Sequence, residues 1–200
     1  MTRLLRDFFA RDTLIVAREL LGQALVHDTP DGRAAGRVVE VEAYTGWNDA
    51  ASHGHRGLTP RSAVMFGPAG IAYVYLCYGV HWMMNVVARP EGVDYPAAVL
   101  IRALEPIEGL HLMEKRRMGR PRRDWSNGPG RLTLALGIGK AQNLADTAGS
   151  HSALHWEQGE TIPDESVMRG PRIGIDVPEP SKSLPWRLWV KDNPHVSRGR

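Results

Sequence analysis

A carboxylate able to activate water stands in an apolar stretch of the first quarter of the chain. Residues 37–44 alternate as in a β-strand. The alternation places Val39, Val41 and Ala43 on one face and Val38, Glu40, Glu42 and Tyr44 on the other. Burying a carboxylate is costly unless partners stabilise it. Glu42 is therefore either a solvated residue at a strand edge or a functional group with partners elsewhere.

A lone arginine interrupts a second apolar run. Arg102 lies between Ile101 and Ala103 in the expected strand 97–104, so its guanidinium must reach a carboxylate, a phosphate or water. A structural ion pair is the simpler interpretation. Glu42 is one candidate partner, and the sequence alone leaves that contact open.

Tyrosines form the third feature. Four of the five, Tyr44, Tyr73, Tyr75 and Tyr78, lie before or within the central strand run. Alternation puts Tyr73 and Tyr75 on one face and Tyr78 on the other. Aromatic stripes in strands are usually core, but buried hydroxyls need partners, so this cluster indicates a partly solvated surface. Flat rings suit a pocket for a nucleobase, because stacking contributes about 1–3 kcal/mol per base.

Two histidines, His53 and His55, stand in a loop expected over 46–70 that is rich in Gly, Pro and Ser. Their spacing resembles that of metal ligands, but no further ligand set accompanies them, so we expect hydrogen-bonding histidines and no metal. No serine stands in a nucleophile elbow, and no phosphate-binding glycine motif precedes a helix. We therefore expect no cofactor.

The elements that must position these residues are mixed in type. Asp12 caps a helix that ends before Gly22, and further helices are expected at 106–117 and 131–136, with a basic loop at 116–124 between them. Strands are expected at 23–27, 37–44, 71–78, 80–88, 97–104, 153–157, 172–176 and 186–191. We predict one α+β domain over residues 1–200.

Composition excludes several classes of protein. The formal charge of +3 permits a polyanionic partner without demanding one. The single cysteine, Cys77, excludes an intramolecular disulfide and a cysteine zinc cluster. Charges, Gly and Pro interrupt every apolar stretch, so we expect no membrane span and no signal peptide, and a cytoplasmic, nucleoid-associated monomer.

Read in order, several short segments resemble the 3-methyladenine DNA glycosylase family, of the alkyladenine type. They are VEVEAY (39–44), DAASH (49–53), TPR (59–61), MF (65–66), YVYLCYG (73–79), MN (84–85), LIRALEP (100–106), GPGRL (128–132) and RIG (172–174). The resemblance covers nearly the whole chain and fades at 116–124 and 149–169. Each motif alone is weak, and their order and spacing carry the match.

The resemblance implies roles for the side chains above. Glu42 would take a proton from the attacking water as a general base, and Arg102 would help to hold that water. Tyr44, His53 and Tyr75 would enclose a base flipped out of the duplex, and His53 would also donate a hydrogen bond to it.

Two further roles follow from the same resemblance. Asn85 would lie near the purine 2-position and crowd the exocyclic amine of normal guanine, and Tyr78 would wedge into the gap that the extruded nucleotide leaves. The implied fold is a single domain built on a curved, mainly antiparallel β-sheet flanked by helices. The implied activity is base-excision repair: hydrolysis of the glycosidic bond of alkylated or otherwise damaged purines in double-stranded DNA, which leaves an abasic site.

Two other functions remain open. A non-catalytic nucleic-acid-binding domain shares this fold class, and a hydrolase of free nucleosides would need no duplex. The first lysine is Lys115, so the segment from Glu42 to Arg102 cannot supply a lysine Schiff base. We therefore predict a monofunctional glycosylase without strand-cleaving lyase activity.

Overall fold

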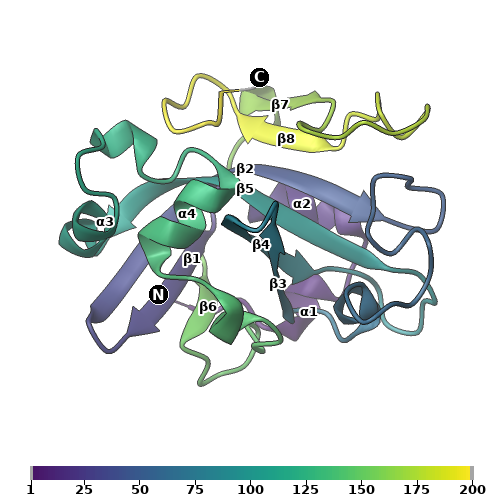
Figure 1. Cartoon of the computed structure of the whole chain (residues 1–200), viewed down its shortest axis with the longest axis horizontal. Coiled ribbons are helices and arrows are strands. Elements are labelled where there is room, and N and C mark those ends of the chain that lie inside the picture. Colours follow the sequence, from purple (N-terminus) through teal and green to yellow (C-terminus); the bar gives the residue numbers. More distant parts are fainter. Residues whose placement is uncertain (1, 199–200) are drawn as a thin grey trace.

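The computed structural model describes residues 2–198 as one curved sheet with four short α-helices (Figure 1). The helices are α1 (Arg6–Phe9), α2 (Thr13–Leu20), α3 (Leu110–Arg116) and α4 (Pro129–Leu136). The strands are β1 (Ala24–Thr29), β2 (Gly32–Thr45), β3 (Ala72–Cys77), β4 (His81–Val87), β5 (Ala97–Glu108), β6 (Leu154–Glu157), β7 (Val167–Gly170) and β8 (Arg187–Val190). Four 3₁₀ turns complete the elements: η1 (Ala63–Phe66), η2 (Arg122–Asp124), η3 (Lys140–Gln142) and η4 (Asp164–Ser166).

All strand pairs are antiparallel, and the main path of the sheet runs β3-β4-β5-β2-β1-β6. β2 organises this sheet. One side of β2 pairs with β5 along nearly its whole length, while the other side pairs first with β1 and then, at Glu40–Glu42, with β8, which carries β7. The predicted α+β class and the curved, antiparallel sheet are confirmed.

A β-bulge changes which side chains of β2 share a face. The register of β2 against β5 shifts between Val38 and Glu40 and again between Glu40 and Val41. Val38 therefore joins the core cluster of Val41 and Ala43, and Val39 is buried outside that cluster. The predicted faces were wrong at these two valines. A bulge inserts one extra residue into a strand, so residues before it point to the opposite face from the one that strict alternation predicts.

The helix expected at 106–117 begins later than predicted. β5 continues through Pro106 to Glu108, and α3 starts only after Gly109. Gly109 has φ +67°, and a Cβ there would lie 2.3 Å from the carbonyl oxygen of Arg33, so glycine is required at this corner. The φ of proline suits an extended strand as well as a first helical turn. For this reason Pro106 does not mark the start of the helix that the sequence predicted.

The strand expected at 172–176 is also wrong. This segment has no strand structure, and the pairing segment lies just before it, as β7. Residues 172–176 instead run past the end of β2. There the side chain of Arg172 donates to the carbonyl of Ala43, and the backbone amide of Ile173 donates to the carboxylate of Glu42. The short helix α1 was not expected from the sequence.

The helices pack on the sheet and close its core. Asp12 accepts hydrogen bonds from the amides of Leu14 and Ile15 and so caps α2 as predicted. α2 lies behind β2, and α4 crosses in front of β4 and β5 (Figure 1). Leu20 of α2 and Leu132 of α4 are both fully buried in the main core. No helix within residues 2–198 has the length and apolar character needed to cross a membrane.

The outer edge of β3 is covered by the chain that follows η3. The Asn143 side chain accepts a hydrogen bond from the amide of Val74 (2.9 Å). The backbone of Ala72 donates to Ala145 and accepts from Leu144. These contacts satisfy backbone groups that an edge strand would otherwise expose.

Candidate active site

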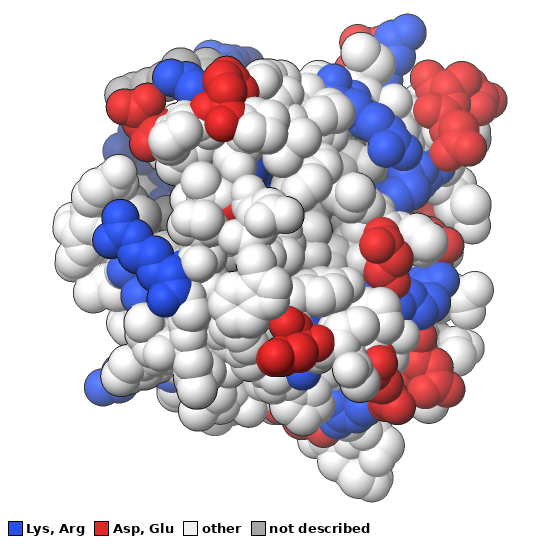
Figure 2. All heavy atoms as spheres, turned by 90° about the vertical axis from the view of Figure 1, so that its right-hand side faces the viewer, with Lys and Arg blue, Asp and Glu red and all other residues white. Residues whose placement is uncertain are grey.

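A cavity of about 360 Å³ opens beside β2, β3 and β4, and all seven predicted site residues line it. They are Glu42, Tyr44, His53, Tyr75, Tyr78, Asn85 and Arg102. The volume falls within the range of small-molecule sites, about 300–1,000 Å³. The face at the right of Figure 1 has an uncharged centre, with basic and acidic groups interspersed around its margin (Figure 2).

Glu42 lies at the bottom of the cavity and has no exposed surface. Its Oε2 accepts a hydrogen bond from the Tyr44 hydroxyl (2.7 Å), and its Oε1 accepts one from the amide of Ile173 (2.7 Å). Arg102 Nη1 lies 3.1 Å from the same Oε1. The alternative of a solvated edge residue is therefore excluded, because Glu42 is buried with a full set of partners.

Arg102 joins two buried carboxylates. Its Nε donates to Glu40 Oε1 (3.0 Å), while Nη1 pairs with Glu42. Glu40 is itself unexposed and also accepts from Arg187 Nε (2.7 Å) and from the amide and hydroxyl of Ser197 (2.7 and 2.8 Å). Burial alone would lower the pKa of Arg102, but the carboxylates of Glu42 and Glu40 outweigh that effect and raise it.

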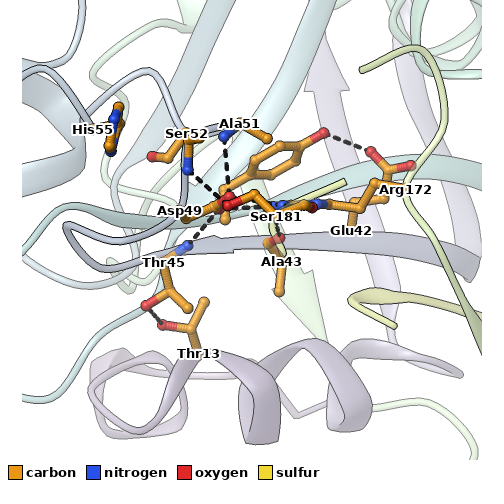
Figure 3. A network of polar contacts seen from close by, with 12 residues as sticks. Thr13, Glu42, Ala43, Thr45, Asp49, Ala51, Ser52, His55, Arg172 and Ser181 are labelled. Atoms are coloured by element: carbon orange, nitrogen blue, oxygen red, sulfur yellow. Dashed lines mark hydrogen bonds and ion pairs between the residues drawn. The ribbon is translucent and has the colours of Figure 1, made fainter. Parts of the chain in front are cut away.

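A buried ion pair holds the segment that covers Glu42. Arg172 and Asp49 are both unexposed and bond through two parallel contacts of 2.6 and 2.7 Å (Figure 3). Arg172 also donates to the carbonyls of Ala43 (2.9 Å) and Ser181 (3.0 Å). Because Arg172 precedes Ile173, these contacts fix the amide that donates to Glu42. We call Asp49 and Arg172 the strap pair.

Tyr44 is clamped from two sides. The guanidinium of Arg172 lies 4.6 Å from its ring centre, and the hydroxyl donates to Glu42. Burial, reinforced by the Glu42 charge, raises the pKa of Tyr44 well above its usual value. The hydroxyl therefore stays protonated and remains a donor.

His53, Tyr73 and Tyr75 form an aromatic wall. The ring centre of His53 lies 4.7 Å from that of Tyr75, at an interplanar angle of 76°, and its Nδ1 is 2.9 Å from the Tyr73 hydroxyl. Partial burial, and then the positive charge of Arg61, lower the pKa of His53 to about 4. The imidazole is therefore neutral at neutral pH. When Nδ1 accepts from Tyr73, Nε2 carries the proton and can donate.

The two remaining predicted residues differ in their exposure to solvent. Asn85 is buried, and its side-chain amide donates to the carbonyl of Tyr73 (3.0 Å). Tyr78 is 92% exposed and stands in the turn between β3 and β4 with φ 49°. Its expected place on the opposite face of the strand does not apply, because β3 ends at Cys77.

Several residues that build this site had no role predicted from the sequence. Glu40, Asp49 and Arg172 share the polar network around Glu42, and Arg61 lies with its guanidinium 4.8 Å from the ring centre of Tyr75. The sequence did contain signals for them. Glu40 comes two residues before Glu42, and Asp49, Arg61 and Arg172 lie in the motifs DAASH, TPR and RIG. Their distances could not be inferred, because 123 residues separate Asp49 from Arg172.

This arrangement presents a buried carboxylate beneath an aromatic cavity. A carboxylate so placed can accept a proton and can stabilise a positive charge that develops above it. The neutral His53 can hydrogen-bond to an occupant. Within residues 2–198, no three His, Cys, Asp or Glu side chains are grouped in a way that could hold a metal ion.

Comparison with known proteins confirms the family resemblance. A family model described as methylpurine-DNA glycosylase matches residues 7–194. Relatives named "Putative 3-methyladenine DNA glycosylase" include one from Myxococcus xanthus, 48% identical over 100% of this chain and 95% of its own length. Another, from Clostridium acetobutylicum, is 44% identical over 98% of this chain and 97% of its own. A third, from Methanocella arvoryzae, is 46% identical over 96% and 94%. With matches of this extent, the chain belongs to the methylpurine-DNA glycosylase family.

Proposed function

We propose that this protein is a base-excision-repair DNA glycosylase that removes alkylated or otherwise damaged purines from duplex DNA. The observation that carries the proposal is the buried Glu42 carboxylate at the bottom of a cavity walled by aromatic rings. Family membership supports the general activity, and the geometry supports the particular mechanism below.

The cavity walls suit a flat, extruded base. Tyr44, His53 and Tyr75 offer ring surfaces, and stacking contributes about 1–3 kcal/mol per base. An enzyme that acts on a base must take it out of the duplex, and a damaged base resists this least. Tyr78, exposed at the tip of the β3–β4 hairpin, fills the gap in the stack. Asn85, which is buried and lines the cavity, crowds the exocyclic amine at the 2-position of a normal guanine.

The chemical step follows glycoside hydrolysis. Water attacks C1′ of the deoxyribose, the glycosidic bond breaks with its electron pair leaving on the purine, and Glu42 takes the proton of the water. Glu42 also stabilises the positive charge that develops on the sugar. The Tyr44 hydroxyl and the backbone amide of Ile173 both donate to the carboxylate, so the mechanism requires the Tyr44 side chain and the backbone at Ile173 to move when a nucleotide enters. Arg102 orients Glu42 and the water.

Replacing the carboxylate tests this mechanism. Glu42→Gln should slow base release about 10²–10⁴-fold, the usual contribution of a general base, while binding to a lesion duplex persists. Release is measured in single turnover, with alkali cleavage of the abasic sites. Glu91→Gln, which alters an exposed carboxylate outside the cavity, is the matched control and should keep wild-type rates.

The same assay separates the alternatives. A non-catalytic binding domain would release no base in the wild type, and Glu42→Gln would change nothing. A hydrolase of free nucleosides would cleave a damaged nucleoside as fast as a damaged duplex. Either result would overturn the proposal.

We also propose that the enzyme is monofunctional. Among the described residues that line the cavity none is a lysine, and the first lysine of the chain is Lys115. Borohydride treatment during turnover should therefore trap no covalent enzyme–DNA adduct, as judged by electrophoresis. An adduct mapped to a lysine would contradict the proposal, and a lysine-dependent lyase run in parallel verifies the trapping.

A further inference from the structure

A second hollow, of about 310 Å³, lies between α3, α4 and the start of β4, and arginines dominate its lining. Its residues are His81, Arg117, Arg120, Asp124 and Arg131. We call it the arginine hollow. α3 and α4 lie together at the left of the molecule in Figure 1, away from the face shown in Figure 2.

The positive charge in the arginine hollow is only partly neutralised within the part of the chain described. Of the lining residues only Asp124 carries a carboxylate, and no carboxylate among residues 2–198 forms a salt bridge with Arg117, Arg120 or Arg131. Asp124 instead accepts a hydrogen bond from the Asn127 side chain (2.9 Å). Three guanidinium groups therefore face one hollow with a single acidic neighbour.

Two of these arginines are held in place by neutral acceptors. Arg131 Nη1 donates to the side-chain oxygen of Asn127 (2.6 Å), and Arg117 Nη2 donates to the carbonyl of Asp124 (3.2 Å). Arg117 Nε is buried with no acceptor among the described residues. Burial, and then the charges of Arg131 and Arg120, lower the pKa of Arg117. The cluster is electrostatically strained in the absence of an anion.

A third hollow lies between the arginine hollow and the catalytic cavity and has lining residues in common with each. This intermediate hollow, of about 390 Å³, shares Arg102 and Pro129 with the catalytic cavity and shares Asp124 and Arg131 with the arginine hollow. Close packing fixes the relation of α4 to the hairpin, because a Cβ on Gly130 would lie 2.8 Å from the side chain of His81. His81 follows Tyr78 by three residues, so the arginine hollow lies at the base of the hairpin tip that carries Tyr78.

We propose that the arginine hollow binds a backbone phosphate of the DNA next to the flipped nucleotide. Guanidinium forks match the geometry and charge of a phosphodiester. A backbone whose nucleotide enters the catalytic cavity beside Tyr78 has its neighbouring phosphates near the adjacent hollows. The inference rests on the proposed function only in taking DNA as the ligand.

Salt dependence of binding tests the site. Each phosphate neutralised adds about 0.9 to the slope of log affinity against log salt. Arg120→Ala and Arg131→Ala should each weaken binding to damaged and undamaged duplexes by the same factor and make the slope shallower by about one unit. The rate of base release at saturating enzyme should not change. Lys140→Ala removes an exposed charge beyond the opposite end of α4 and should leave the slope unchanged.

Arg120 makes the test robust, because its exposed side chain forms no hydrogen bond or salt bridge within residues 2–198 and its loss should not affect folding. A series of duplexes, each with one neutral methylphosphonate near the lesion, then locates the contact. At one position the effect of Arg120→Ala should vanish, as expected for two interacting groups in a double-mutant cycle. If both arginine variants bind with wild-type affinity and slope, the inference is wrong even where base release is intact. If the wild type shows the expected slope but releases no base, the proposed function fails and the phosphate site stands.

Discussion

His53 shows how neighbours determine what a side chain can do. Its ring lies among Tyr73, Tyr75 and Arg61. Partial burial and then the Arg61 charge lower its pKa, so the imidazole stays neutral at pH values well below the usual pKa of histidine. A neutral imidazole can receive an alkylated purine, which is cationic, without charge repulsion. Its one N–H is available as a donor while Nδ1 accepts from Tyr73.

This state of His53 can be measured directly. In the wild type the NMR titration of the His53 imidazole should give a pKa of about 4. Arg61→Ala should raise that pKa, because the nearby positive charge is removed, whereas Arg56→Ala, an exposed arginine of the same loop, should not. A folded-state pKa below the unfolded value also means that stability rises with pH between about 4 and 6.5 and is lost as the pH falls through that window. A wild-type pKa near 6.5 would refute the assignment.

At the level of elements, the strap pair links two segments that share no strand pairing. Asp49 lies in the loop after β2, Arg172 lies after β7, and their contact places the Ile173 amide on Glu42. The loop itself is anchored by Asp49, which accepts from the amides of Thr45 (3.3 Å) and Ala51 (3.1 Å). Both the cover of the carboxylate and the approach of His53 therefore depend on one buried ion pair.

Breaking the strap pair should cost far more than breaking a surface pair. Asp49→Asn leaves Arg172 buried and uncompensated, which should reduce the free energy of unfolding by about 3–5 kcal/mol. Asp176→Asn removes the exposed partner of Lys182 and should cost at most about 1 kcal/mol. Urea denaturation measures both. Equal effects of the two changes would argue against a structural role for the strap pair.

The sequence predicted those elements whose local pattern is regular. Alternation identified β2 and the β3–β4 pair, and Asp12 and Gly22 bounded α2. Prediction failed where tertiary contacts override local preference. The bulge at Glu40 changes the face on which Val38 and Val39 lie, and no local residue pattern predicts a bulge there. Pro106 continues strand β5 instead of starting a helix. Arg172 and Ile173 bond to the backbone and a side chain of β2 and do not pair as a strand.

Across the whole molecule, the site draws on segments from both halves of the chain. Residue type and strand periodicity identified Glu42, Arg102 and the tyrosines as candidates. The order of the motifs indicated the family, and the family resemblance supplied their roles. Glu42 was a candidate partner of Arg102 from the sequence, and the structure pairs the two at 3.1 Å. The other partners of Arg102, Glu40 and Ser197, could not be derived, because they are 157 residues apart in the chain and only folding brings them together. Burial of two carboxylates side by side is tolerated because Arg102 lies between them.

The C-terminal tie to Glu40 should be measurable as stability. Ser197→Ala removes a hydroxyl donor from a buried carboxylate, and a hydrogen bond to a charged group is worth about 1.5–3 kcal/mol. Ser166→Ala, in η4 away from Glu40, should change the free energy of unfolding by less than about 0.5 kcal/mol. Thermal and urea unfolding of the two variants provide the comparison. A Ser197→Ala protein as stable as the wild type would show that the tail does not brace the network.

The segment 143–145 that lies along β3 has a further consequence. β3 carries Tyr73 and Tyr75 and ends the main path of the sheet, the position at which a foreign strand could add itself and extend the sheet. Because Asn143 and Ala145 already occupy that edge, an incoming chain would first have to displace them. The strand that supplies Tyr73 and Tyr75 to the cavity wall therefore offers little free edge at Ala72 and Val74 for another chain to pair with.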